Sequence, residues 1–452
     1  MYTLTFLNGI SVYEFEGSIW SEKEGVYNAS YLKGSLEEDH FFTNFATQIT
    51  HEGHPPLYFI TLKLWSYFFG TSELALRSFS LSCGLLVFLV LFNLFKQISN
   101  KSYTAWIILS LLVCNPFLFY FFNEARMYAM AFLLATICFS FWKGYVKNKS
   151  IRSKAFLYFS LSSIGLLYTH YYGIFFIVSL IFIDIIRNGF NKSIFNYSIP
   201  FICFLPWLSV IFNQIKLHDI HWTDGAVSFG QSMIGYFEGI INLFFSPIEN
   251  PTNWEYRIIC LVLIGLILLL SFKKLKFALT LLLTIVLYGV QIYFFDQVVD
   301  HHTILIPRYY IFVLIPIFWG LFVLIENSNV YYSIGIAVIY ISLCSTVLFQ
   351  IYKLDRSQKE MIREVAGFVD QYIDVKSRVL VFEPKGPLMY GVAYYLKKDY
   401  TMISADKARI NFVKNPVYID ERLGVDYREN QLHNNNQDSL KMIPFVGVFV
   451  YK

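Results

Sequence analysis

The chain has 452 residues, of which 56% are hydrophobic and only 15% are charged, and its mean hydropathy is +0.49. This composition excludes an ordinary soluble globular protein and indicates a polytopic membrane protein, because a soluble domain does not need so much apolar surface. The formal net charge of +4 is small and unevenly spread, so it informs the membrane topology and gives no sign of a nucleic-acid partner.

The first 53 residues are mixed in character and contain eight acidic residues against two lysines. They include no run of about 20 apolar residues, the length that a membrane-spanning helix needs. The opening residues lack a basic segment, so they do not resemble a signal peptide. After His54-Pro55-Pro56, the apolar segment 57–70 is interrupted by Lys63 and is too short to span, which favours an interfacial helix. We therefore predict an outer loop with an interfacial helix over residues 1–76.

Ten apolar runs follow, and we predict that they form about ten spans of a transmembrane domain that covers residues 1–350. They lie near residues 77–95, 102–122, 127–142, 155–169, 171–186, 195–212, 256–272, 277–295, 307–325 and 330–349. The fourth and fifth runs are nearly continuous, and we place their division at Thr169-His170-Tyr171. All six cysteines lie in apolar runs without the close spacing of a metal motif, which indicates small core residues.

Basic residues occupy every second connection between these runs, which assigns those connections to the cytoplasm. They are Lys96, Lys101, Lys143, Lys147, Lys149, Arg152, Lys154, Arg187, Lys192, Lys273, Lys274 and Lys276. The alternate connections are acidic, His-rich or nearly neutral, and we assign them to the outer face. The connection at 326–329 has no base where the alternation predicts a cytoplasmic loop, so it is uninformative.

After residue 350 the composition changes to that of a soluble domain. The patterns predict a small α/β domain over residues 351–452, and the alternation of charge places it outside the cytoplasm. Its predicted elements are a helix at 358–373, a strand at 378–382, a helix at 387–396 and a closing strand at 445–451.

A polar island, Asn123-Glu124-Ala125-Arg126, interrupts the apolar sequence where two predicted spans meet. An ionisable pair at such a place is a functional hypothesis, because the solvation that it loses must be recovered by pairing or by a ligand. The alternative is a polar turn whose Glu124 and Arg126 simply face lipid headgroups.

The predicted topology collects other polar groups on the same face as this island. They are His54, His170, Tyr171, His218, Asp219, His221, His301, His302 and Arg308. Arginine suits phosphate because its planar fork donates two hydrogen bonds, and a carboxylate can deprotonate a hydroxyl or hold a divalent metal. Such a set could bind a phosphorylated lipid and perform acid/base chemistry. For any single histidine, a plain outer-surface position is the simpler interpretation.

Five stretches of the chain resemble the GT-C membrane glycosyltransferases, the superfamily of protein O-mannosyltransferases and lipid A aminoarabinose transferases. They occur in family order, cover most of the chain and lie on one predicted face. The stretches are HPPLYFITLKLWSYFFGTSELALRSFSLSCGLL at 54–86, NPFLFYFFNEARMYAM at 115–130, THYYGIFF at 169–176, PRYYIFVLIPIF at 307–318, and EMIREVAGFVDQYI leading into RVLVFEP at 360–384.

The resemblance implies a polytopic GT-C-like fold and an inverting transfer of a sugar from a polyprenyl-phosphate donor to a glycan, lipid or protein acceptor. The transfer would occur at the outer face of the cytoplasmic membrane. By this resemblance Glu124 is the second acidic residue of the site, with Arg126 and Tyr128 beside it. His54 lies near the donor phosphate and Arg308 pairs with it, and we count His170 and Tyr309 among the substrate-binding residues. Positive charge for the leaving phosphate would come from arginine or a divalent metal ion.

Two departures from the family pattern stand out. The family has an acidic pair in its first outer loop, whose leading Asp is the expected base, whereas this chain has Glu22-Lys23-Glu24 and no aspartate there. We predict Glu24, then Glu22, as the base, because glutamate is only one methylene longer, while a charged Lys23 could not act as one. The first transmembrane helix of the family is also absent. We expect the chain as given to lack its natural start, or residues 1–20 to be a remnant.

Two alternatives to an active transferase remain open at the level of the sequence. One is a transporter or flippase for a lipid-linked or anionic substrate, which would need polar residues near mid-bilayer and broken helices in matched halves. The other is a catalytically degenerate relative, in view of the missing aspartate. No motif encodes the donor sugar or the acceptor. The site is expected to bring Glu24 or Glu22, His54, Glu124 and Arg308 to one outward cavity.

Overall fold

The protein is described from a computed structural model. The structure describes residues 7, 27–28, 41–217, 225–245, 275–372, 379–383, 392, 395–398, 401–404, 416–420, 440–442 and 449–451. The chain divides into two compact units, Glu52–Phe349 and the combination of Met1–His51 with Gln350–Lys452. The described part of residues 1–51, which we expected with the transmembrane part, therefore groups with the C-terminal residues.

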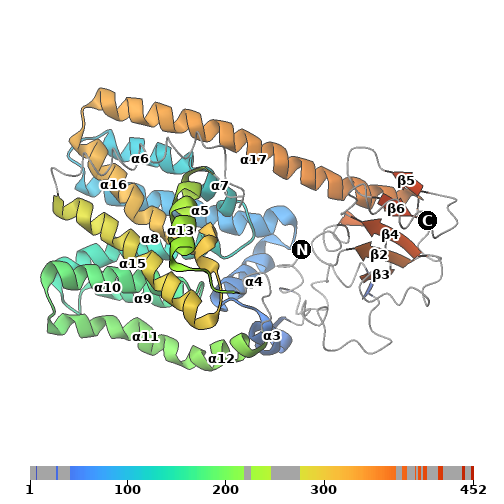
Figure 1. Ribbon diagram of the computed structural model, residues 1–452, viewed down its shortest axis with the longest axis horizontal. Helices are drawn as coiled ribbons and strands as arrows, with labels where there is room; N and C mark the ends of the chain where they lie inside the picture. Colours follow the sequence, from blue (N-terminus) through green and yellow to red (C-terminus); the bar gives the residue numbers. More distant parts are fainter. Residues whose placement is uncertain are drawn as a thin grey trace. The chain divides into compact units, whose positions relative to one another are not determined.

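The unit Glu52–Phe349 is a bundle of helices (Figure 1). Its α-helices are α4 (Leu57–Phe69), α5 (Glu73–Ile98), α6 (Thr104–Val113), α7 (Pro116–Phe122), α8 (Tyr128–Asn148), α9 (Lys154–Leu167), α10 (Gly173–Asn188), α11 (Ser198–Phe204), α12 (Leu208–Leu217), α13 (Phe229–Phe245), α15 (Leu275–Val299), α16 (Leu314–Asn327) and the first part of α17 (Val330–Tyr372). Four 3-10 segments complete it: η3 (Lys192–Tyr197), η4 (Leu205–Trp207), η7 (Thr303–Leu305) and η8 (Pro307–Val313).

Five of the described helices are long and apolar enough to cross a bilayer, or six if the bent pair α6–α7 is one span. The five are Glu73–Ile98, Tyr128–Asn148, Lys192–Ile215, Pro307–Asn327 and Val330–Phe349. The chain is thus a multi-pass membrane protein, and the predicted polytopic α-helical fold is confirmed. The predicted span at 256–272 lies outside the described residues.

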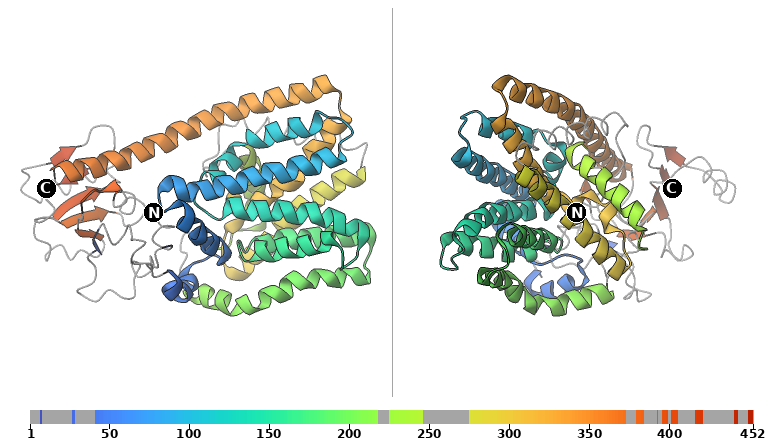
Figure 2. Two further views of the ribbon diagram at one scale, coloured as in Figure 1. Left: turned by 180° about the vertical axis from the view of Figure 1, so that it is seen from behind. Right: turned by 60° about the vertical axis from the view of Figure 1, so that its left-hand side comes forward.

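α8 and the stretch Pro307–Asn327 are the most buried of these five spans, with 61% and 78% of their most apolar stretches buried, against 17% for Lys192–Ile215. α8 contacts α5, α9 and α10. Because lipid tails are as apolar as the side chains, packing and small residues hold such helices together. Gly84 of α5 is one such residue, since a Cβ there would lie 2.4 Å from the Phe122 ring. In the views of Figure 2, α11 and α12 lie on the opposite side of the bundle from residues 330–349.

Two predicted spans are not straight helices. The run 102–122 is broken into α6 and α7 with a bend of 64°. Asn115 ends the first piece and caps the second, because its Oδ1 accepts from Leu118 N (2.8 Å) and Pro116 starts α7. The run 195–212 is assembled from η3, α11, η4 and α12.

The predicted gap between two helices near residue 350 is absent. We expected a span at 330–349 and a separate helix at 358–373, but α17 continues without interruption over 43 residues. The change from apolar to polar side chains near residue 350 does not end a helix, because backbone hydrogen bonds do not depend on side-chain polarity and no proline lies in this stretch.

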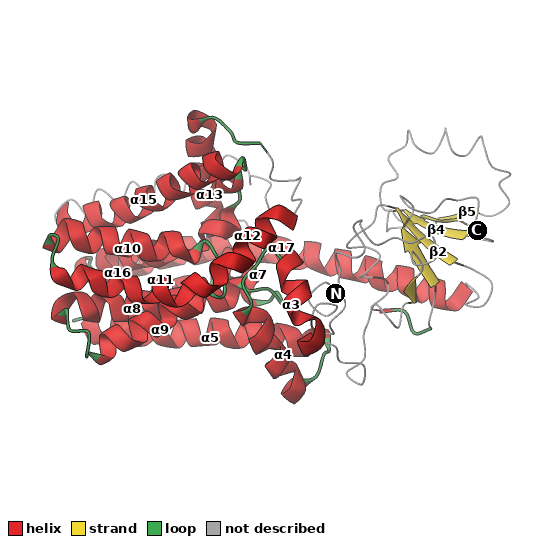
Figure 3. Ribbon diagram, turned by 90° about the horizontal axis from the view of Figure 1, so that it is seen from below, coloured by secondary structure: helices red, strands yellow, loops and turns green. Residues whose placement is uncertain are grey.

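The other unit contains helix α3 (Phe41–His51) and a six-stranded mixed sheet, drawn in yellow in Figure 3. The strands are β1 (Tyr27–Asn28), β2 (Val379–Glu383), β3 (Thr401–Ser404), β4 (Pro416–Asp420), β5 (Leu440–Met442) and β6 (Phe449–Tyr451), in the order β1-β3-β2-β4-β6-β5. β2 pairs in parallel with β3 and β4, and the other pairs are antiparallel. The predicted strands at 378–382 and 445–451 correspond to β2 and β6. The predicted helix at 387–396 lies mostly outside the described residues.

The connection at 326–329 is held against the connection between α5 and α6. The Glu326 carboxylate accepts from Ser99 Oγ (2.6 Å) and Asn100 N (2.8 Å), and Lys101 Nζ donates to the Ser328 carbonyl (2.7 Å). The connection at 326–329, which has no basic residue, therefore lies on the same face of the bundle as the basic connection between α5 and α6. The alternation of charge requires this arrangement.

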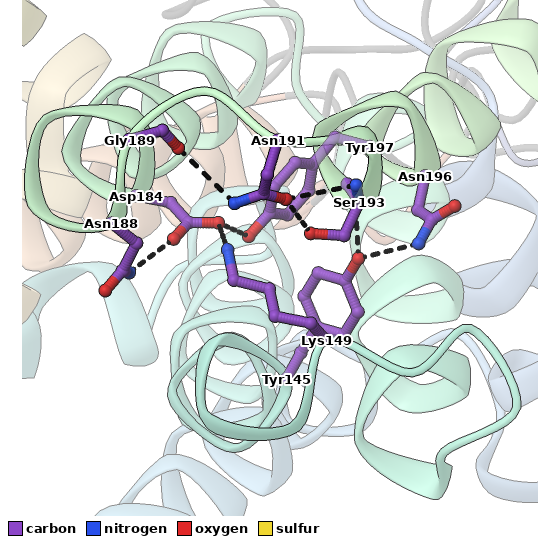
Figure 4. A network of polar contacts seen from close by, with 9 residues as sticks. All are labelled: Tyr145, Lys149, Asp184, Asn188, Gly189, Asn191, Ser193, Asn196 and Tyr197. Atoms are coloured by element: carbon purple, nitrogen blue, oxygen red, sulfur yellow. Dashed lines mark hydrogen bonds and ion pairs between the residues drawn. The ribbon is translucent and has the colours of Figure 1, made fainter.

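A buried carboxylate joins the ends of three further elements. Asp184 of α10 is fully buried and accepts from Lys149 Nζ, Tyr197 OH (2.7 Å) and Asn188 Nδ2 (2.7 Å) (Figure 4). Lys149 ends α8 in the left-handed conformation, with φ 54°. Tyr145 adds a bond to the Ser193 carbonyl (2.9 Å), so the end of α8, the end of α10 and η3 form one polar network.

Candidate functional site

Four connections of the bundle meet at one end. They are the residues before α4 (52–56), the turn between α7 and α8 (123–127), the turn between α9 and α10 (168–172) and the segments η7 and η8 (303–313). Leu57 N donates to the Tyr168 carbonyl (2.9 Å), which ties α4 to the second turn. Tyr172 OH donates to Thr303 Oγ1 (2.5 Å), which ties that turn to η7. Residues far apart in the sequence are thereby brought to one place.

His170 lies among aromatic rings at the centre of this end. Its ring centroid is 5.5 Å from Tyr128, 5.7 Å from Tyr172, 5.8 Å from Phe312, 6.1 Å from Tyr309 and 6.3 Å from His54. Each of these rings comes from a segment that the sequence had singled out. Tyr172 and Tyr309 stack on one another at 4.6 Å with nearly parallel planes.

The His170 imidazole is 2% exposed, and neither of its ring nitrogens has a hydrogen-bond partner among the described residues. Burial, with the charges of His54 and Arg308, lowers its pKa to about 3. The ring is therefore neutral near pH 7, with one nitrogen that donates and one that accepts. A buried polar group without a partner costs about 1–3 kcal/mol, and such exceptions call for a functional explanation. A ligand could supply the missing partners.

His54 is paired with a buried acid. Its Nδ1 lies 2.6 Å from Glu52 Oε1, and the Glu52 side chain is 2% exposed, whereas that of His54 is 31% exposed. Gln214 of α12 donates to the Glu52 carbonyl (2.5 Å) and accepts from Tyr171 OH (2.5 Å). Trp207 Nε1 donates to the same hydroxyl (3.0 Å), and burial raises the pKa of Tyr171 to about 12, so this phenol stays protonated. These hydrogen bonds hold the backbone of Glu52, the residue that pairs with His54, in place.

The Glu124 turn holds the second charged pair. Glu124 Oε2 lies 3.3 Å from Arg126 Nε, and these side chains are 22% and 55% exposed, respectively. Arg77 of α5 donates to the Asn123 carbonyl (3.2 Å) and pairs with Glu73 one helical turn away (3.1 Å), which anchors the turn. The turn thus presents a partly solvated acid–base pair at the rim of the aromatic cluster.

η8 carries Arg308 and Tyr309. The Arg308 guanidinium lies 5.6 Å from the Tyr309 ring centroid, and Tyr128 interacts electrostatically with Arg308, Arg126 and Glu124. The Glu124 turn and Arg308 therefore act on the same residue at the same end of the bundle.

α15 holds two of the converging segments together. The Tyr288 hydroxyl is within hydrogen-bond distance of the Tyr172 carbonyl (3.0 Å) and the Tyr309 carbonyl (2.8 Å), which share its single proton. Two turns further along α15, Asp296 accepts from Thr303 Oγ1 and from Ile304 N (2.7 Å). These bonds fix the relative position of the His170 turn and of η8.

Six residues predicted for the site lie in these converging segments, and a seventh, Tyr128, directly follows one of them as the first residue of α8. The six are His54, Glu124, Arg126, His170, Arg308 and Tyr309. Glu22, Glu24 and the group His218, Asp219 and His221 lie outside the described residues. His302 directly precedes η7, and its Nδ1 lies 3.2 Å from the Gly225 carbonyl. The roles of the predicted residues stay predictions.

Sequence reasoning missed several polar groups that support the site: Glu52, Arg77, Gln214, Tyr288 and Asp296. Arg77 lies within the stretch 54–86 that resembles the family, so that stretch offered a signal for it. Gln214 and Tyr288 give no local signal, because their hydrogen-bond partners lie 162 and 116 residues away along the chain. Glu52 and Asp296 have partners only two and seven residues away, at His54 and Thr303.

The described residues contain no group of three or more His, Cys, Asp or Glu side chains that could hold a metal ion. The carboxylates of Glu52 and Glu124 each pair with a base, His54 and Arg126. A divalent metal ion remains a prediction.

Comparisons with known proteins identify the fold. ArnT from Cupriavidus metallidurans, in the crystal structure bound to undecaprenyl phosphate, is similar over 88% of this chain and 87% of its own, with 10% sequence identity and a TM-score of 0.52. The apo structure of the same protein matches 89% of this chain and 88% of its own, with 10% identity and a TM-score of 0.49. No family model and no curated protein matches the sequence. The chain therefore shares with ArnT the GT-C-like fold that the resemblance implied.

Proposed function

We propose that this protein is a membrane glycosyltransferase that transfers a sugar, with inversion, from a polyprenyl-phosphate donor to a cell-envelope acceptor. The reaction would take place at the outer face of the cytoplasmic membrane. The C-terminal unit would lie on that side too, as the alternation of charge suggests. The neighbour of the same fold was crystallised with undecaprenyl phosphate, which supports a lipid of this class as the donor's carrier.

The observation that supports this proposal most is the convergence around His170. A cation on η8, two imidazoles and a shell of tyrosines meet where four connections of a membrane bundle end. Arginine and imidazole suit a phosphate, and tyrosines offer both apolar faces and hydroxyl groups to a sugar ring. A neutral imidazole with one donor and one acceptor is matched by a sugar hydroxyl, which can accept and donate, better than by a phosphate, which only accepts.

The proposed roles follow from this chemistry. Arg308 pairs with the donor phosphate and stabilises the charge that develops as it leaves, with His54 nearby. His170, Tyr128 and Tyr309 contact the sugar. Glu124, held by Arg126, is the second acid, and Glu24 or Glu22 of the first loop is the expected base.

A transporter is the second candidate, because a broken helix is typical of transporters and α6–α7 is broken at Asn115. The polar groups at this break are already used, however. Asn115 Nδ2 donates to the Leu243 carbonyl (3.1 Å) and to Tyr340 OH (3.0 Å), while its Oδ1 caps α7. The break is therefore satisfied within the protein, and the structure favours chemistry at the His170 end.

The test is sugar transfer from radiolabelled polyprenyl-phosphate sugars in membranes that contain the full chain. We expect the parent to consume one donor, and Arg308→Ala and Glu124→Gln to lose at least a hundredfold of that rate, as is usual for groups that stabilise charge or move protons. Arg308→Lys should recover only part, because an ammonium lacks the bidentate fork. Arg187→Lys, an exchange in the last turn of α10, is the matched control and should keep the parent rate. Full activity of Arg308→Ala would contradict the assignment.

A further inference from the structure

His170 is enclosed by the protein, and only its side chain lacks hydrogen-bond partners. Its backbone N–H donates to the Leu166 carbonyl (2.9 Å), and its carbonyl accepts from Gly173 N (2.9 Å). Its imidazole is 2% exposed, and no group among the described residues bonds to Nδ1 or Nε2. This state of a buried polar side chain is explained if a ligand completes its hydrogen bonds.

The rings that surround His170 form an aromatic shell without charge. The ring centroids of Tyr128, Tyr172, Phe312 and Tyr309 lie 5.5, 5.7, 5.8 and 6.1 Å from the imidazole. Tyrosine is neutral near pH 7, because its ordinary pKa is about 10. A ligand that contacts His170 therefore meets apolar ring faces, which suit the carbon face of a sugar.

The two nitrogens of His170 determine which ligand groups fit. The neutral imidazole has one nitrogen that donates and one that accepts. An ammonium group only donates and a carboxylate only accepts, so either would satisfy one nitrogen and leave the other unpaired. A hydroxyl group donates or accepts as its position requires. Hydroxyl groups of one sugar ring can therefore satisfy both nitrogens.

The charges near His170 also disfavour a charged sugar. Burial and the charges of His54 and Arg308 lower the pKa of His170 to about 3, so the surroundings oppose a positive charge on the imidazole itself. They oppose an ammonium group on a ligand for the same reason. The carboxylates of Glu52 and Glu124 already pair with bases, so neither is free to serve as its counterion. A carboxylate on the sugar would compete with the donor phosphate for Arg308.

We propose that His170 hydrogen-bonds to hydroxyl groups of the transferred sugar and thereby restricts the donor to uncharged sugars. The inference rests on the proposed function and names the class of its donor. Uncharged hexoses and pentoses belong to this class. Amino sugars and uronic acids that place their charge at His170 are rejected. The imidazole selects the sugar and takes no proton in the reaction.

The test compares donors in membranes that contain the full chain. The donors are the uncharged one that the parent consumes, its single-deoxy analogues, and analogues with an amino or a carboxyl group at the same positions. We expect the parent to lose at least a thousandfold in kcat/KM with the analogue that lacks the hydroxyl at His170, because a site built to bond a hydroxyl strongly rejects its absence. The amino and carboxyl analogues at that position should lose at least a hundredfold.

Variants of His170 separate selection from a structural role. His170→Phe removes both nitrogens, so it should lose at least a hundredfold in kcat/KM with the uncharged donor, yet treat this donor and the deoxy analogue alike to within about tenfold. His170→Gln keeps one donor and one acceptor and should retain part of the discrimination. His302→Phe is the matched control and should discriminate as the parent does.

A parent that prefers an amino-sugar donor, or a His170→Phe variant that slows every donor by the same factor, would overturn the inference while the transferase stands. Absence of turnover with every donor would instead contradict the proposed function. Binding to the folded full chain then decides, with undecaprenyl phosphate, undecaprenyl-phosphate hexoses and pentoses, and their amino counterparts as probes. At least tenfold tighter binding of an uncharged sugar phosphate than of undecaprenyl phosphate, in the parent and not in His170→Phe, agrees with the inference. The absence of this gain refutes it.

Discussion

The buried imidazole of His170 makes a quantitative prediction about acid stability. Its pKa in the folded protein is about 3, against an ordinary value of 6.5, because burial and the charges of His54 and Arg308 oppose its protonation. Between these two values the unfolded chain binds a proton that the folded protein does not. The free energy of unfolding therefore falls by about 1.4 kcal/mol for each pH unit below 6.5 through this one group. At pH 5 the loss is about 2 kcal/mol relative to pH 7.

The variant His170→Gln removes this titration while keeping one donor and one acceptor at the site. We expect the difference in unfolding free energy between parent and variant to shift by about 2 kcal/mol in favour of the variant when the pH falls from 7 to 5. Denaturant unfolding in detergent micelles at both pH values measures it. The control His302→Gln removes a more accessible imidazole and should follow the parent. An equal pH dependence in parent and His170→Gln would refute the reasoning.

Two further predictions concern hydrogen bonds at the two ends of the bundle. Tyr288→Phe removes the bridge between two site segments, so we expect about tenfold lower kcat, whereas Tyr145→Phe, which loses a similar bond in the network of Figure 4, should keep the parent rate at similar stability. Lys149→Met leaves the Asp184 carboxylate buried without its cation and should cost about 3–5 kcal/mol of unfolding free energy. Adding Asp184→Asn should restore much of that loss, and an additive double variant would contradict the coupling.

Much of the fold could be predicted because its signals are local. Apolar runs separated by polar turns predicted the helices, and the turn at Thr169-His170-Tyr171 lies between α9 and α10 as expected. The break at Asn115 was missed because the apolar residues on both sides were taken as one run, although Asn115-Pro116 within it is a local signal for the end of a helix. The length of α17 was missed for the opposite reason, because a change in composition was taken as the end of a helix that the backbone continues.

Some residues of the site could be predicted from the sequence around them, and others could not. His170, Arg308 and Tyr309 could be proposed because their stretches resemble a family. Tyr288 could not be proposed, because its hydroxyl bonds to carbonyl groups that are 116 and 21 residues away along the chain. Within an apolar helix such a tyrosine is indistinguishable from a core residue until the fold brings its hydroxyl to those carbonyls.

A buried polar side chain lies near each end of α10, and only one of the two has hydrogen-bond partners among the described residues. At its C-terminal end, Asp184 is fully buried, and its carboxylate is satisfied by a lysine, a tyrosine and an asparagine. Just before its N-terminal end, about 20 Å away, His170 is buried with both ring nitrogens unpaired among the described residues. A structural polar group needs the first arrangement, because an unpaired one costs stability. The second arrangement is expected where a ligand supplies the partner, so the asymmetry itself argues that the His170 end is the one that binds substrate.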